Sequence, residues 1–160
     1  MGLVRVLAID PGPHVGIATW TDKHVVNSGY EGASYEERWA EWEETPERFY
    51  AVVTNWVGWA DEVVAENFFI SGARASSANA TIEMIGVIRY ECMLQHTPFV
   101  LQPPGEAKGF STNDKLKRIG WWRPSKTDHA RSATRHLLLY LANRKYIEAS
   151  RLLQSDAEEV

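Results

Sequence analysis

Cysteine is nearly absent from this sequence: Cys92 is the single one in 160 residues. No disulfide framework can form within the chain, which favours a reducing compartment, and we expect a cytoplasmic protein. Long apolar runs are missing too, since no stretch approaches the roughly 18 residues that a membrane-spanning helix needs. Residues 1–10 also lack the layout of a signal peptide, so we expect no membrane part.

An excess of positive charge is lacking as well, because the net charge is −4. Spread evenly, that charge would argue against a polyanionic partner. However, residues 31–66 carry ten acids and two arginines, whereas residues 108–135 carry eight lysines and arginines against two acids. Such a basic block indicates a face that attracts phosphates. The simpler interpretation is an ordinary solvated charged surface.

The most informative stretch is Val4–Trp20, in which an apolar run ends at an acid and a turn rich in proline and glycine leads into a second apolar run. This pattern predicts a buried strand, a tight turn and an antiparallel return strand. Asp10 ends the first strand, where packing alone has no use for a carboxylate. Gly12 and Gly16 would let the backbone come close to whatever Asp10 holds.

Periodicity and turn residues predict the rest of the chain. The expected elements are, in order, a strand over His24–Tyr30, a helix from Ser34 to about Gly58 with a break near Pro46, a strand over Val63–Ala65 that ends at Glu66, a helix over Ser76–Gln95, a strand over Phe99–Leu101, a polar segment with short helices over Gly105–Gly120, and a helix from Ser125 to about Asn143. In the second helix, Ile82, Ile85, Ile88, Cys92 and Met93 should share a buried face, with Gly86 at a close contact. Trp121 and Trp122 are predicted to anchor the polar segment. We therefore expect one α/β domain over residues 1–160, with a central mixed five-stranded sheet flanked by helices and a frayed tail at 151–160.

Three acids far apart in the sequence, Asp10, Glu66 and Asp128, each stand at the boundary of an element. If one sheet edge gathers them, their mutual repulsion calls for cations, and Mg²⁺ is the natural hard ion for carboxylate ligands, with Mn²⁺ as a substitute. Two such ions could activate a water and stabilise the leaving oxygen of a phosphodiester. Together with the basic block, these acids predict a nuclease.

Each acid also has a structural interpretation. Asp10 before Pro-Gly is a common turn residue, and Glu66 could cap the segment that follows it. Asp128 stands three residues after Ser125, in the pattern of a helix capping box. The functional interpretation rests on the three acids taken together with the basic block.

At three places the sequence resembles the RuvC family of Holliday-junction resolvases, of the RNase H-like superfamily. The family's opening strand carries Asp-Pro-Gly, as does the stretch AIDPGPHVGIA here. Its catalytic glutamate ends a strand and is followed three residues later by an aromatic residue, which corresponds to Glu66 and Phe69 in VVAENFFI. Its last helix has an Asp in an Ala-rich turn and a His eight residues later, which corresponds to Asp128 and His136 in DHARSATRH. Three motifs in this order span about residues 4–146. The resemblance implies an RNase H-like fold.

By that resemblance, the three acids are metal ligands and catalytic residues of a homodimer that cleaves branched DNA in recombination, repair or replication. Phe69 would stack on a base near the junction centre, and Lys108 and Lys115 would contact phosphates beside the scissile bond. The basic block adds three further candidate DNA-binding residues: Lys117, Arg118 and Arg131.

One departure from the family lies near Asp128. The family has a fourth acid or a histidine three residues before its last Asp, where this chain has Ser125; on the other alignment, the missing acid falls at Arg131. His129 could serve as an auxiliary ligand, or it could simply face solvent. The departure suggests a divergent member of the bacteriophage type, for which the compartment would be the host cytoplasm. Two other functions stay open: a nuclease-dead module that binds junctions or RNA, and an RNA-processing nuclease of the same superfamily.

Overall fold

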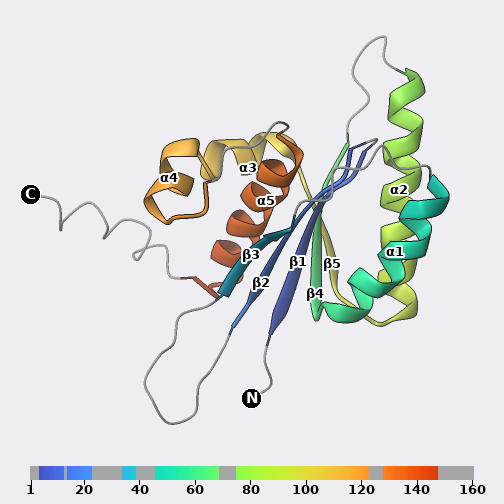
Figure 1. Cartoon of the computed structure of the whole chain (residues 1–160), viewed down its shortest axis with the longest axis horizontal. Coiled ribbons are helices and arrows are strands. Elements are labelled where there is room, and N and C mark those ends of the chain that lie inside the picture. The colour runs from blue at the N-terminus through green and yellow to red at the C-terminus, as the bar shows by residue number, and fades with distance from the viewer. Residues whose placement is uncertain are drawn as a thin grey trace, which may run out of the picture.

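The computed structural model describes residues 4–12, 14–22, 34–38, 46–68, 75–122 and 128–147. Five strands form one mixed sheet: β1 (Arg5–Asp10), β2 (Gly16–Thr21), β3 (Ser34–Arg38), β4 (Glu62–Glu66) and β5 (Phe99–Gln102). Five helices accompany them: α1 (Pro46–Trp59), α2 (Ala75–Leu94), α3 (Pro104–Phe110), α4 (Asn113–Arg118) and α5 (His129–Asn143). Figure 1 shows α1 and α2 on one side of the sheet and α3, α4 and α5 on the other. The predicted α/β class and the mixed five-stranded sheet are confirmed.

The strand order β3-β2-β1-β4-β5 decides which residues meet at the sheet edge. β1 and β2 form the predicted antiparallel hairpin, with Asp10 opposite Gly16. β4 runs parallel to β1, with Ile9 paired to Ala65, and β5 runs parallel to β4. Since parallel strands end at the same edge, Asp10 and Glu66 close two adjacent strands side by side.

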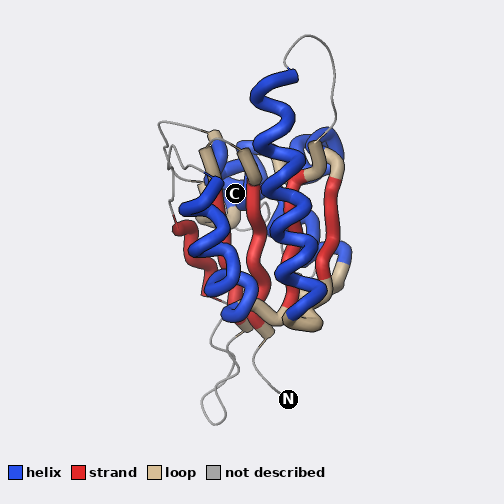
Figure 2. The backbone as a smooth tube through the Cα atoms, turned by 90° about the vertical axis from the view of Figure 1, so that its right-hand side faces the viewer, coloured by secondary structure: helices blue, strands red, loops and turns tan. Residues whose placement is uncertain are grey.

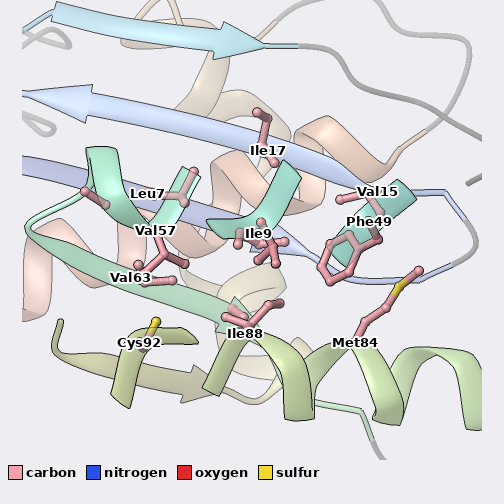
Figure 3. Packing of buried hydrophobic residues seen from close by; sticks show 13 residues of the cluster. Leu7, Ile9, Val15, Ile17, Phe49, Val57, Val63, Met84, Ile88 and Cys92 are labelled. Atoms are coloured by element: carbon pink, nitrogen blue, oxygen red, sulfur yellow. The ribbon is translucent and has the colours of Figure 1, made fainter. Parts of the chain in front are cut away.

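Residues of the central strands alternate between two buried faces, because both faces carry helices. Leu7, Ile9 and Val63 point toward α1 and α2, where they pack on the buried side chains Phe49, Val53, Val57, Met84, Ile88 and Cys92. Figure 3 shows this layer from close by, and Figure 2 shows α1 and α2 in front of the sheet, running roughly along its strands.

The opposite face of the sheet packs on α5. Val6, Ala8 and Val64 meet the buried stripe of α5, which consists of Ala133, Leu137, Tyr140 and Leu141. The helical spacing of Ala130, Ala133, Leu137 and Leu141 marks the same stripe in the sequence, and all four are fully buried. α5 is thereby held against β1, β2 and β4.

The polar segment after β5 forms two short helices, as predicted. Leu116 of α4 packs on Leu138 of α5, with Trp121 and Trp122 partly buried against the same cluster. The two tryptophans therefore anchor this segment, as the sequence indicates. The anchored segment carries Lys108 on α3 beside the sheet edge.

The third strand is the main error of the sequence prediction. Residues 34–38 were expected to begin a helix, but they form β3 and pair with β2, with Trp20 opposite Tyr35. The helix begins only at Pro46, where a residue without an N–H group costs no hydrogen bond. Pairing to the outer edge of β2 outweighs the helical spacing of residues 34–45. The strand predicted over residues 24–30 lies outside the described residues.

The buried face of α2 was predicted only in part. Ile85, Ile88 and Cys92 are buried, but Ile82 is 43% and Met93 62% exposed. Gly86 marks no close contact either, since a Cβ added there would have nothing within 4 Å. The apolar residues of α2 are spread over several sides of the helix, so their spacing in the sequence could not identify the side that meets the sheet.

Candidate active site

Asp10 lies at the end of β1 with only 8% of its surface exposed. Its Oδ2 is 3.0 Å from Nδ1 of His129, the first residue of α5. Desolvation raises the pKa of Asp10, the hydrogen bond with His129 opposes that shift, and the nearby charge of Glu66 adds to it. The anionic form of Asp10 is therefore costly, and a cation beside it would stabilise it.

Glu66 ends the neighbouring strand and is held by two side chains of α5. Its Oε2 accepts hydrogen bonds from Nε2 of His136 at 2.9 Å and from Oγ of Ser132 at 2.6 Å. His136 is fully buried, and its Nδ1 lies 2.9 Å from Oε1 of Gln102 on β5. Burial alone would raise the pKa of Glu66, but these two donors outweigh it, and the pKa lies below its usual value. Glu66 is thus fixed in place as a carboxylate.

Gly16 brings α5 close to Asp10. A Cβ on Gly16 would lie 2.1 Å from the carbonyl carbon of His129 and 2.4 Å from the backbone N of Ala130. Only glycine leaves room for the first turn of α5 at this point. The sequence predicted that Gly16 lets the backbone approach a ligand of Asp10, whereas the group that requires glycine there is the first turn of α5.

A pocket of about 370 Å³ opens at this sheet edge. Its walls consist of Asp10, Pro11, Gly12, Glu66, Phe68, Thr81, Lys108, Asp128, His129, Ser132 and Arg135. The structure thus brings together five of the residues that the sequence predicted for the site: Asp10, Glu66, Lys108, Asp128 and His129.

Asp128 borders this pocket but differs from the other two acids. Its side chain is 78% exposed, and Oδ1 accepts from Nη1 of Arg131 at 2.7 Å. α5 begins at His129 with Asp128 at the N-cap position, and the Asp128 side chain makes no capping hydrogen bond. The helix start predicted at Ser125 and the capping-box interpretation of Asp128 are therefore wrong, because Asp128 precedes the first helical turn. Ser125 itself lies outside the described residues.

The donor set fits a hard divalent cation only in part. Within the described ranges, the hydrogen bonds of Asp10 and Glu66 use Oδ2 and Oε2, and none uses Oδ1 or Oε1. Two carboxylates and water suit Mg²⁺, which is commonly held by one or two acids. Among those same residues, however, no three His, Cys, Asp or Glu side chains are grouped closely enough to share an ion. Asp10 and Glu66 together fit a metal ion. Asp128, while it is bound to Arg131, does not serve as a third ligand.

The other predicted cations, three on α4 and Arg131 on α5, do not line the pocket. Lys115 sits 3.8 Å from the centre of the Phe110 ring and donates to the backbone oxygen of Phe110. Desolvation, followed by the charge of Arg118, lowers the pKa of Lys115. The charged groups of Lys117 and Arg131 lie over the ring of Trp122, at 5.1 and 5.0 Å. Arg118 lies in the last turn of α4. Phe69, predicted to stack on a base, is outside the described residues, and its neighbour Phe68 borders the pocket with 37% exposure.

Sequence reasoning missed Thr81, Ser132 and Arg135 as pocket residues. A signal for two of them was present, since Ser132 and Arg135 follow Asp128 at the i+4 and i+7 spacing that shares one helix face. Thr81 carried no such signal, because the exposed and buried sides of α2 are alike in composition.

The sequence matches no protein-family model and no curated protein. The structure, however, is similar to that of Thermus thermophilus RuvC in complex with a Holliday junction substrate, with a TM-score of 0.63 and 16% sequence identity over 89% of this chain and 96% of that one. A second Thermus thermophilus RuvC structure matches with a TM-score of 0.59 and 15% identity over 89% of this chain and 97% of the other. The predicted resemblance is confirmed at the level of the fold: the chain has the RNase H-like fold of the RuvC resolvase structures.

Proposed function

We propose that this protein is a divalent-metal-dependent endonuclease that cleaves Holliday junctions or other branched DNA. The observation that carries the proposal is the pairing of Asp10 and Glu66 at the ends of adjacent parallel strands, in one pocket with the cations Lys108 and Arg135. Carboxylates that hold a metal and cations that bind phosphate are what phosphodiester hydrolysis requires. The likeness to a RuvC structure bound to a Holliday junction substrate supports branched DNA as the substrate.

Asp10 and Glu66 would hold Mg²⁺, with Mn²⁺ as a substitute. When bound, such an ion lowers the pKa of a water molecule and offsets the charge of the phosphoryl oxygens. His136 and Ser132 keep Glu66 ionised and correctly oriented by donating to its Oε2. His129 orients Asp10 through its hydrogen bond to Oδ2. Lys108, which also helps to lower the pKa of Glu66, would bind an oxygen of the scissile phosphate.

Asp128 is the third acid of the proposed site. To bind an ion it must leave Arg131, which its 78% exposed side chain is free to do by rotation. A second ion, as expected from the sequence, would depend on this movement. The proposal also includes one nuclease domain per chain, a homodimer that cleaves two strands, and base stacking by Phe69.

The test is cleavage of labelled four-way, flap, fork and duplex DNA by the purified protein in Mg²⁺, alongside the same four-way junction made of RNA. We expect branched DNA to be cut and Asp10→Asn to slow cleavage by at least about a hundredfold, the loss typical of removing one electrostatic stabiliser. Glu47→Gln is the matched control, because Glu47 is an exposed acid in the first turn of α1. Cleavage of no branched DNA would refute the proposal. Binding without cleavage would favour the nuclease-dead module that binds junctions or RNA. Preferential cleavage of the RNA junction would favour the RNA-processing nuclease.

A further inference from the structure

Arg135 is a cation in the pocket wall that forms no salt bridge with an acid of the described residues, although the charges of Asp128 and Glu66 act on it. It lies one turn after Ser132 on α5 and is partly buried. Its Nη2 donates to Oδ1 of Asn113, a neutral amide, at 2.6 Å. Desolvation and, after it, repulsion from Arg131 lower the pKa of Arg135 and outweigh the opposing attraction of Asp128 and Glu66. A partly buried guanidinium with a neutral partner is a cation whose environment favours an added anion.

Arg131, which the sequence favoured as the DNA-binding arginine of this helix, is in a different situation. Its Nη1 is bound to Asp128 at 2.7 Å, and its guanidinium lies over Trp122. Its side chain is only 13% exposed. Of the two arginines, Arg135 is the one that borders the pocket.

The contacts around Arg135 hold it in position for a ligand. Asn113 opens α4 and fixes one arm of the guanidinium. Oγ of Ser111, which is fully buried, donates to the backbone oxygen of Arg135 at 2.9 Å. The junction between α3 and α4 therefore ties both the backbone and the side-chain end of this residue. Among the described residues, Asn113 is the one hydrogen-bond partner of the guanidinium, whose fork can bind an anion through two N–H groups.

We propose that Arg135, held by Asn113, binds a phosphodiester group of the nucleic-acid strand that enters the pocket, opposite the carboxylates and beside Lys108. The identity of the ligand rests on the proposed function. Arginine suits this role because its planar fork matches two phosphate oxygens.

The test measures binding, not turnover, so that it does not depend on cleavage. Fluorescence anisotropy with a labelled four-way DNA junction in EDTA, over a series of salt concentrations, compares the wild type with Arg135→Gln, Arg135→Lys and Asn113→Ala. The control is Arg89→Gln, since Arg89 is an exposed arginine of α2 that does not line the pocket. Thermal unfolding of each variant reports whether the fold is retained.

We expect Arg135→Gln to weaken binding about tenfold or more, as for a lost charged hydrogen bond. It should also lower the slope of log affinity against log salt by about one, as for one lost phosphate contact. Arg135→Lys should keep that slope and lose affinity, and Asn113→Ala should behave in the same way because the charge remains. Arg89→Gln should match the wild type.

An Arg135→Gln variant with the affinity and salt slope of the wild type would overturn the inference, even if the protein cleaves junctions. A wild type that binds no branched DNA would overturn it as well. Conversely, if Arg135→Gln lowers the slope and the wild type cleaves nothing, the phosphate-binding role stands and the proposed nuclease fails.

Discussion

Replacing Gly16 by alanine should damage both the fold and the site. The new Cβ would lie 2.1 and 2.2 Å from the carbonyl carbon and oxygen of His129, whereas ordinary contacts begin at 3.4 Å. The first turn of α5 would have to move by about 1 Å, and because the colliding atoms are backbone, no side-chain rotation relieves the clash. Overpacking of this kind costs about 1–3 kcal/mol of unfolding free energy.

The same movement carries His129 and Ser132 away from Asp10 and Glu66. A misplacement of about 1 Å in a catalytic group can cost about a hundredfold in rate. The assays are urea unfolding, in which a loss of about 2 kcal/mol lowers the midpoint by about 1 M, and the rate of junction cleavage. Both should fall in Gly16→Ala.

Two other glycines serve as matched controls for the same substitution. A Cβ on Gly12 would meet its nearest neighbours at 3.6 Å, an ordinary contact, so Gly12→Ala should leave stability nearly unchanged. Gly86 lies within α2 with open space around it, so Gly86→Ala should raise stability by about 0.5–1 kcal/mol. A Gly16→Ala protein as stable as Gly12→Ala would refute the close contact between β2 and α5.

Three further outcomes follow from the site. Burial raises the pKa of Asp10 above its usual value of 3.8. The native state therefore binds the carboxyl proton of Asp10 more tightly than the unfolded chain does. As a result, the contribution of Asp10 to the free energy of unfolding falls as the pH rises above 3.8. In EDTA, Asp10→Asn should therefore unfold at a higher temperature than the wild type at pH 7 and lose that advantage near pH 4; a less stable variant at pH 7 would contradict the pKa shift. His136→Ala removes the side-chain partner of Gln102 and one of the two donors to Glu66, which keeps Ser132. It should cost about 2–4 kcal/mol in urea unfolding, and an unchanged midpoint would show that these contacts contribute nothing. Mn²⁺ at about 100 times its Kd should stabilise the wild type by about 2.7 kcal/mol, whereas it should hardly stabilise Asp10→Asn. Equal thermal shifts for both proteins would argue against a metal at Asp10.

Much of the fold could be predicted because its signals are local. The β1–β2 hairpin follows from an apolar run, a Pro-Gly turn and a second run, and the stripe of α5 from a repeat of apolar residues. β3 was missed for the opposite reason: residues 34–38 become a strand only because β2 offers an unpaired edge. The buried face of α2 was likewise set by its neighbours α1 and β4, since its own residues are apolar on several sides.

The sequence by itself placed Asp10 and Glu66 at strand ends, because an acid that closes an apolar run is visible along the chain. It also revealed the basic block over residues 108–135. The tertiary structure alone decided which cations reach the pocket, because this depends on how α3 and α4 dock on α5. Lys108 and Arg135 line the pocket together with the carboxylates, while Lys115, Lys117 and Arg131 are engaged with aromatic rings. Only the structure shows why Gly16 must be glycine, since the helix that approaches it lies more than a hundred residues later in the chain.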